Sequence, residues 1–263
     1  MSFPSLIHMN EGEQFSEYTD QRWPLGQKAA LPDGREYRYA LIGGVNVATG
    51  KLTQAEVPGA NFDELAVPAA EAIGQTVLTI TNGATTAVKD LFAEGYVNVE
   101  DDTGEGYLYK IKSSAAELAG SAPIDITIEN SRRNVVTGAA EGTKGLMLAW
   151  TTLTTVGLTK SPFRDVIIHP SPNTAVLTGV TPRPLTAARY GWLQVRGPAS
   201  VLVQGTHVIG LSVQPSSSAD GAVTPFTLTE GTPNTEITPV CGDCMEVAAT
   251  TEHGLVNLKV AGW

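Results

Sequence analysis

The most regular pattern in the chain lies between Tyr190 and Pro215, where apolar and polar residues alternate in short runs. Apolar side chains recur at every second position in two of the runs, and a third apolar run covers Val208–Val213. Gly197-Pro198 and Gly205-Thr206 separate the runs, because glycine tolerates a positive φ and proline fixes φ near a turn value. Alternation with a break every eight to ten residues or so predicts three short strands of an antiparallel sheet or barrel.

Similar patterns predict strands along the rest of the chain. The clearest is Ile124–Glu129, in which the three isoleucines face one side and the polar residues the other. The other predicted strands are Tyr37–Val47, Thr76–Thr81, Tyr96–Val99, Tyr107–Lys112, Gly145–Leu158, Asp165–His169 and Gly254–Val260. Ala66–Ile73 and Ala87–Phe92 are each predicted to form a helical turn that a glycine ends. The sequence therefore predicts an all-β fold of antiparallel sandwich or barrel-like domains with few short helical turns.

The sequence divides into three regions that differ in their residue patterns. Residues 1–36 lack periodicity and mix acidic residues with isolated aromatics, so we expect an extended N-terminal arm that docks on another subunit; the alternative is a disordered tail. Residues 37–185 are predicted to form a β-rich domain that ends in a linker or crossover, Thr181–Leu185. Residues 186–263 are predicted to form a small C-terminal barrel-like domain.

The excess of acidic over basic residues bears on which kinds of partner the protein can bind. Of the 263 residues only 17% are charged, and the formal net charge is −10. Nucleic-acid affinity depends on clustered lysine and arginine, whereas the basic residues here are scattered, so no nucleic-acid partner is expected. No stretch approaches the ~18 consecutive apolar residues of a membrane helix, and the first residues lack the basic start of a signal peptide. We expect synthesis in the cytoplasm and no membrane partner.

The two cysteines, Cys241 and Cys244, allow three interpretations. They are reduced thiols in a loop, a disulfide across a tight turn, or part of a metal site. Zinc normally takes four ligands, and the chain has no second cysteine pair. We therefore predict no metal or cofactor site, and the sequence leaves open whether the two cysteines are bonded.

Catalytic signatures are missing from the sequence. It contains no phosphate-binding loop, no HExxH and no GxSxG. The acidic run Asp101–Glu105 has the wrong spacing for a helix-flanked calcium loop and is predicted to be a solvated hairpin tip. Neighbouring carboxylates such as Asp63 and Glu64 make a glycosidase-like pair conceivable, but a sequence cannot show the burial that such a pair requires. We expect a protein that is not an enzyme and has no catalytic residues.

Two stretches resemble a known family. They are DGREYRYALIGGVNVATGKLTQAEVP (33–58) and YGWLQVRGPASVLVQGTHVIGLSVQP (190–215), the second followed by a polar loop and DGAVTP (220–225). They are similar to stretches of the head-decoration, or cement, proteins of tailed bacteriophages and of related virion proteins. The CGDC sequence is no part of that resemblance.

The resemblance implies a structural virion protein that binds the outside of the capsid. Its partners would be the major capsid protein and further copies of itself, as a homotrimer that bridges and stabilises capsid subunits. Alternatives are another virion component, such as a tail, head-fibre or receptor-binding protein, and a carbohydrate-binding β-sandwich module that stacks sugars on tryptophan. The residues expected to contact the capsid or a neighbouring subunit are Phe15, Tyr18, Trp23, Trp192 and Trp263.

Overall fold

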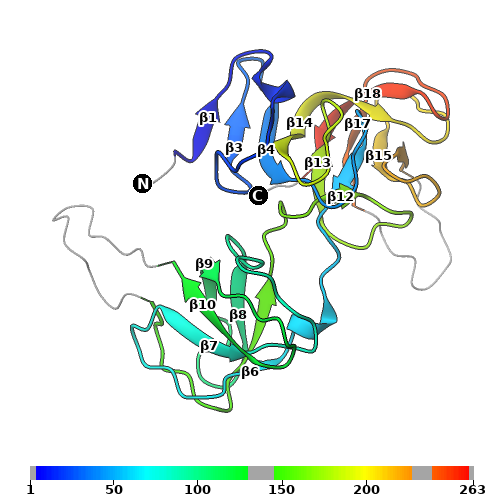
Figure 1. Cartoon of the computed structure of the whole chain (residues 1–263). Helices are drawn as coiled ribbons and strands as arrows, with labels where there is room; N and C mark the ends of the chain where they lie inside the picture. The colour runs from blue at the N-terminus through cyan, green and yellow to red at the C-terminus, as the bar shows by residue number, and fades with distance from the viewer. Residues whose placement is uncertain (1–3, 130–144, 227–238, 261–263) are drawn as a thin grey trace. The chain divides into compact units, whose positions relative to one another are not determined.

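The structure, a computed structural model, describes residues 4–129, 145–226 and 239–260 and is nearly all β (Figure 1). These residues form strands and two short 3₁₀ turns, η1 (Glu13–Phe15) and η2 (Ala60–Phe62). The strands are β1 (Leu6–His8), β2 (Glu17–Tyr18), β3 (Lys28–Ala30), β4 (Glu36–Leu41), β5 (Leu52–Gln54), β6 (Leu65–Ala66), β7 (Val77–Thr81), β8 (Tyr96–Asp101), β9 (Leu108–Ser114), β10 (Pro123–Ile128), β11 (Thr155–Thr159), β12 (Ile167–Ile168), β13 (Leu177–Val180), β14 (Tyr190–Leu202), β15 (Ser212–Pro215), β16 (Val223–Pro225), β17 (Gly242–Cys244) and β18 (His253–Lys259). The predicted all-β fold with few short helical turns is confirmed.

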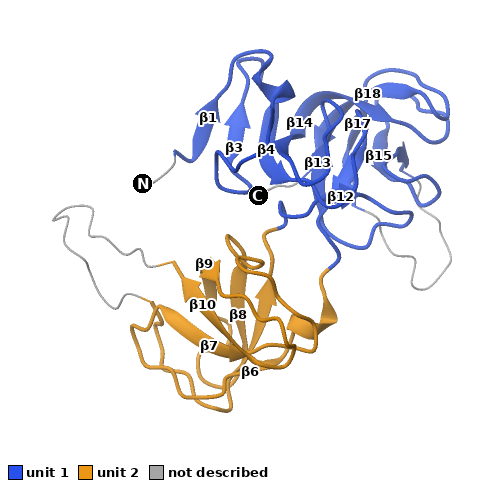
Figure 2. Cartoon of the chain, viewed as in Figure 1, with its two compact units in different colours: residues 1–57, 162–263 blue, residues 58–161 orange. Residues whose placement is uncertain are grey.

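The chain divides into two compact units (Figure 2). Unit 1 comprises residues 1–57 and 162–263, and unit 2 comprises residues 58–161. These limits differ from the predicted divisions after residues 36 and 185. The reason is long-range pairing: β4 and β5, which precede unit 2, pair with β14, β13 and β12, which follow it. Local patterning does not reveal such partners.

Unit 1 is built around β14, its longest strand. The sheet runs β1-β3-β4-β14-β18-β17-β15-β16, and β13, β5, β12 and β2 branch from it. β14 pairs antiparallel with β4 along its first half and with β18 along its second half. Two buried apolar clusters lie along this strand, one beside β4 and the other beside β18.

The Gly197-Pro198 break predicted within this region is wrong. β14 continues through both residues, because Gly197 takes a φ of +83° and the pairing with β18 stays in register across Pro198. The register with β4 shifts between Gln194 and Arg196, which marks a β-bulge. The third predicted strand also begins later than expected, since β15 starts at Ser212 and Val208–Leu211 is a loop.

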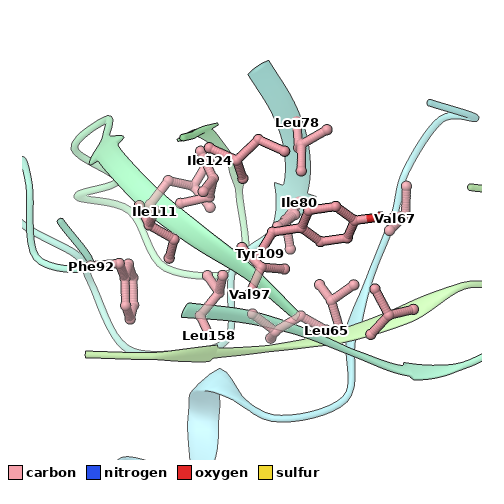
Figure 3. Packing of buried hydrophobic residues seen from close by; sticks show 14 of the residues in the cluster. Leu65, Val67, Leu78, Ile80, Phe92, Val97, Tyr109, Ile111, Ile124 and Leu158 are labelled. Carbon is pink, nitrogen blue, oxygen red and sulfur yellow. The ribbon is translucent and has the colours of Figure 1, made fainter. Parts of the chain in front are cut away.

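Unit 2 is a small, nearly closed barrel. Its sheet runs β6-β11-β8-β9-β10-β7, and the two end strands, β6 and β7, follow one another in the chain and lie in contact. Alternate residues of the strands fill the interior, as Figure 3 shows for Leu78, Ile80, Ile111 and Ile124. The predicted inward direction of the three isoleucines in β10 is confirmed, because each is at most 1% exposed.

Four further predictions need correction. The predicted strand Gly145–Leu158 is a strand only where it overlaps β11 (Thr155–Thr159); the residues before β11 are loop, with Trp150 buried and bridged to Glu71. The predicted strand Asp165–His169 shrinks to Ile167–Ile168. Ala66–Ile73 and Ala87–Phe92 form turns and bends in place of helical turns, because their backbone groups bond to other segments, as Ala87 does with Glu117.

The N-terminal segment is extended and lies against its own unit. Its strands β1 and β3 pair with each other, β3 pairs with β4, and β2 pairs with β14. Met9, Leu25 and Leu31 are buried in the first cluster of unit 1. Docking of this segment on another subunit stays a prediction.

Candidate binding surface

Five aromatic side chains form a continuous cluster on one face of unit 1. Their ring centroids lie 5.1–6.3 Å apart, within the range at which aromatic pairs attract one another. Tyr39 and Trp192 are buried, and Tyr18, Trp23 and Tyr190 are half-buried. We call these five residues the aromatic cluster.

Strand register assembles this cluster from three parts of the sequence. Tyr39 on β4 lies directly opposite Trp192 on β14, so the two side chains share a face of the sheet. Tyr190 is two residues before Trp192 and shares that face, and β2 brings Tyr18 opposite Tyr190. Trp23 then packs edge-on against Tyr18 and Tyr39.

An arginine completes the cluster at the surface. The guanidinium carbon of Arg22 lies 5.0 Å from the ring centroid of Tyr18, a cation–π arrangement. The backbone N–H of Arg22 donates to the hydroxyl of Tyr39 at 3.2 Å. Burial raises the pKa of Tyr39 to about 12, so this hydroxyl stays protonated at neutral pH. The cluster is therefore a fixed apolar surface with one cation and polar edges.

Phe15 lies beside a shallow groove of about 200 Å³ in the same unit. Phe15 is 46% exposed, and the groove walls include Arg35, Tyr37 and Gln194. Tyr37 precedes Tyr39 by two residues on β4, so the groove continues the face that carries the aromatic cluster. The Arg35 guanidinium already contacts the carboxylates of Asp33 and Glu11, which leaves it poorly placed to bind a further anion.

The structure brings together three of the five predicted contact residues. Tyr18, Trp23 and Trp192 share the aromatic cluster, and Phe15 lies at the groove on the same face. Trp192, at 1% exposed, is a support for the surface and does not reach it. Trp263 lies outside the described residues.

Sequence reasoning missed Tyr39 and Tyr190 as members of this surface. Both lie in segments predicted to be strands, but the segments were assigned to separate domains. The usable signal was the alternation of aromatics at two-residue spacing in both segments, Tyr37 with Tyr39 and Tyr190 with Trp192. Two strands that each carry aromatic side chains on one face can pair so that those side chains lie opposite one another.

Both cysteines are free and buried in the second cluster of unit 1. The sulfur of Cys241 lies 3.4 Å from the carbonyl oxygen of Val213, and that of Cys244 lies 3.0 Å from the carbonyl oxygen of Glu246. Burial raises the pKa of Cys241 to about 12, which leaves almost no thiolate at neutral pH. The structure thus agrees with two reduced thiols, as in the first of the three interpretations, but Cys244 belongs to β17 and does not lie in a loop.

The acidic residues of unit 2 make local structural contacts. Asp102 accepts hydrogen bonds from the hydroxyls of Thr151 and Thr154, which hold the pKa of that carboxyl below its ordinary value. Burial raises the pKa of Glu100, the nearby Asp63 carboxyl raises it further, and the backbone N–H of Glu64 opposes the shift by donating to Glu100 at 2.9 Å. Within the three described ranges, no three histidine, cysteine or carboxylate side chains come close enough to hold a metal ion.

Comparisons with known proteins give no relative. No family model, no curated protein and no solved structure matches the chain. In the parts of the chain that the structure describes, no helix is long and apolar enough to cross a membrane.

Proposed function

We propose that this protein is a structural component of a tailed-phage virion that binds the outer surface of the capsid as a homotrimer and bridges capsid subunits. The observation that carries the proposal is the half-buried aromatic cluster of unit 1, with Arg22 over Tyr18. The proposed partner is the major capsid protein, and the proposed role involves no reaction.

The chemistry of the cluster suits protein recognition. Tryptophan, tyrosine and arginine dominate the energetics of protein interfaces, and the two aromatic residues offer large contact areas with few rotatable bonds. Here the rings are held by one another and by the sheet, so binding would cost little side-chain ordering. Such a preordered surface supports the proposal of a binding role.

Two further features support the virion assignment. The stretches that resemble decoration proteins include β4 and β14, the strands that carry the cluster. The net charge of −10 keeps many neighbouring copies soluble, and repetition over a lattice multiplies weak contacts by avidity.

The test is co-sedimentation of the purified chain with expanded heads of the virus that encodes it. Wild type should pellet with heads, and Trp23→Ala and Arg22→Ala should each weaken binding about tenfold or more, as loss of an interface hot spot does. Leu118→Ala, which changes an exposed apolar residue of unit 2, serves as the control and should bind as wild type does. A chain that ignores heads would refute the proposal.

Two other functions use the same surface. A tail, head-fibre or receptor-binding protein would be present in a few copies per virion, whereas a capsid-binding protein should be present in hundreds; densitometry of purified virions separates the two. The half-buried rings of Trp23 and Tyr18 also suit stacking on sugars. Glycan-dependent quenching of tryptophan fluorescence that Trp23→Ala removes would favour the carbohydrate-binding module.

A further inference from the structure

A second surface of unit 1 exposes apolar side chains where a loop would ordinarily be polar. Val208, Ile209 and Leu211 are 52%, 61% and 54% exposed, and Met245 and Val247 are 43% and 62% exposed. We call these five residues the apolar patch. None of them belongs to the aromatic cluster or to the groove at Phe15.

Backbone hydrogen bonds hold the two segments of the patch side by side. The N–H of His207 donates to the carbonyl of Ala248 at 3.0 Å, and the N–H of Gly210 donates to the carbonyl of Cys244 at 2.9 Å. The N–H of Cys244 returns a bond to the carbonyl of Leu211 at 2.8 Å. Residues 207–211 therefore run antiparallel to residues 244–248, and the five apolar side chains lie on neighbouring stretches of backbone.

The chemistry of the patch is that of a buried contact. Turns usually carry glycine, asparagine, aspartate, serine or proline, because these residues suit turn backbone conformations. This turn has glycine at Gly210 only, and its other residues are valine, isoleucine and leucine; Glu246 is the one ionisable residue of 208–211 and 245–247. On a chain with a net charge of −10, a neutral apolar surface of this kind fits an equally apolar partner.

The area of the patch suits a second copy of the chain. At these exposed fractions the five side chains present on the order of 450 Å², within the range of functional patches on monomers. Two copies meeting patch to patch would bury on the order of 900 Å² from these side chains alone, and the turn backbone brings the contact to the roughly 1,000 Å² that a specific interface needs. Contact around a two-fold axis uses the same patch on both copies, so one sequence supplies both sides.

We infer that the apolar patch is the surface through which copies of this chain associate with one another. The inference deepens the proposed function, on which its biological use rests, by naming a surface through which two copies of the chain would pair. It leaves the aromatic cluster free for the capsid.

The test is analytical ultracentrifugation of the full-length chain over a range of concentrations. Wild type should sediment as an oligomer, and Ile209→Asp and Val247→Asp should each raise the dissociation constant about tenfold or more, because a carboxylate would be buried without a partner. Leu118→Asp and Leu153→Asp place the same charge at residues that are 72% and 75% exposed in unit 2, and they should associate as wild type does. Far-ultraviolet circular dichroism confirms that each variant is folded.

The outcomes separate this inference from the proposed function. A monomeric wild type, or folded patch variants that associate as wild type does, would overturn the inference, even if the chain still co-sediments with heads. An oligomer that the patch variants dissociate, but that does not bind heads, would support the inference and refute the proposed function. Equal loss of association in the patch and control variants would also overturn it, since any added charge would then suffice.

Discussion

At the scale of single residues, two tryptophans have different roles because they differ in burial. Trp192 and Trp23 touch one another in the aromatic cluster, with ring centroids 5.2 Å apart. Trp192 is enclosed by the sheet and supports the surface, whereas Trp23 is half-buried and available to a partner. The sequence analysis predicts that both tryptophans contact the capsid or a neighbouring subunit. The local pattern shows neither which residues surround a tryptophan nor how exposed it is.

Replacement of the two tryptophans should separate these roles. Trp192→Ala should lower the free energy of unfolding by about 3–5 kcal/mol, as removal of a buried aromatic does. Trp23→Ala should lower it by less, because its ring loses less buried area, and should act mainly on binding. Urea denaturation followed by circular dichroism measures both values, and an equal loss of stability in the two variants would contradict this division.

His207 gives a second prediction at this scale. Burial lowers the pKa of His207 below its ordinary value of 6.5, and the nearby backbone carbonyls of Val223 and Gln204 offset part of the shift. The unfolded state then binds the proton more readily than the folded state, so the contribution of His207 is full above a pH of about 6.5 and is lost as the pH falls through the lowered folded value. His207→Leu should therefore gain stability relative to wild type as the pH is lowered from 7.5 to 5. Denaturation curves across that range would refute the assignment if the difference between the two proteins stayed constant.

At the scale of elements, the parts predicted correctly are those whose pattern is local. β7, β8, β9 and β10 were predicted within a few residues, because each alternates cleanly, and β8, β9 and β10 pair in sequence order. β2 and β6 have two residues each, too few for any pattern, and were missed. The Gly197-Pro198 break failed for another reason: glycine and proline are typical of turns, and only the in-register pairing with β18 shows that the strand continues through them.

Substitution of Gly83, which lies in a loop of unit 2, tests how closely this loop approaches the segment that contains Asn61. A Cβ added at Gly83 would lie 1.8 Å from the carbonyl oxygen of Asn61, whereas one added at Gly44 would meet no atom within 4 Å. Gly83→Ala should therefore force the backbone apart and lower the free energy of unfolding by about 1–3 kcal/mol or more, and Gly44→Ala should change it little. Thermal denaturation of the two variants provides the comparison. A Gly83→Ala protein as stable as the Gly44→Ala protein would show that Asn61 and Gly83 are not in contact.

At the scale of the whole molecule, the chain carries separate buried cores. The core of unit 2 is drawn from residues 65–158, and the two clusters of unit 1 from residues on both sides of it. Such a division is invisible to composition, which varies little along the chain. It became apparent only when β4 and β5 were seen to pair with strands more than a hundred residues later, a separation that local alternation does not encode.

Separate cores predict two calorimetric transitions. Ile126→Ala, in the core of unit 2, should lower the midpoint of one transition, and Leu193→Ala, in the first cluster of unit 1, should lower the other. Differential scanning calorimetry of wild type and the two variants makes the measurement. A single transition that both variants shift together would show that the units unfold as one.

The pairing of β4 with β14 also sets an order of events during synthesis on the ribosome. Residues 1–57 emerge first, but their partner strands are translated only after the whole of unit 2. The edge of β4 that pairs with β14 therefore stays unpaired until β14 has been made. All the strands of unit 2 have been translated by residue 161, so unit 2 can fold while translation continues. On nascent chains stalled just after β15, protease should spare the middle of the polypeptide and cut its beginning, the reverse of the usual progression from the first residue onward.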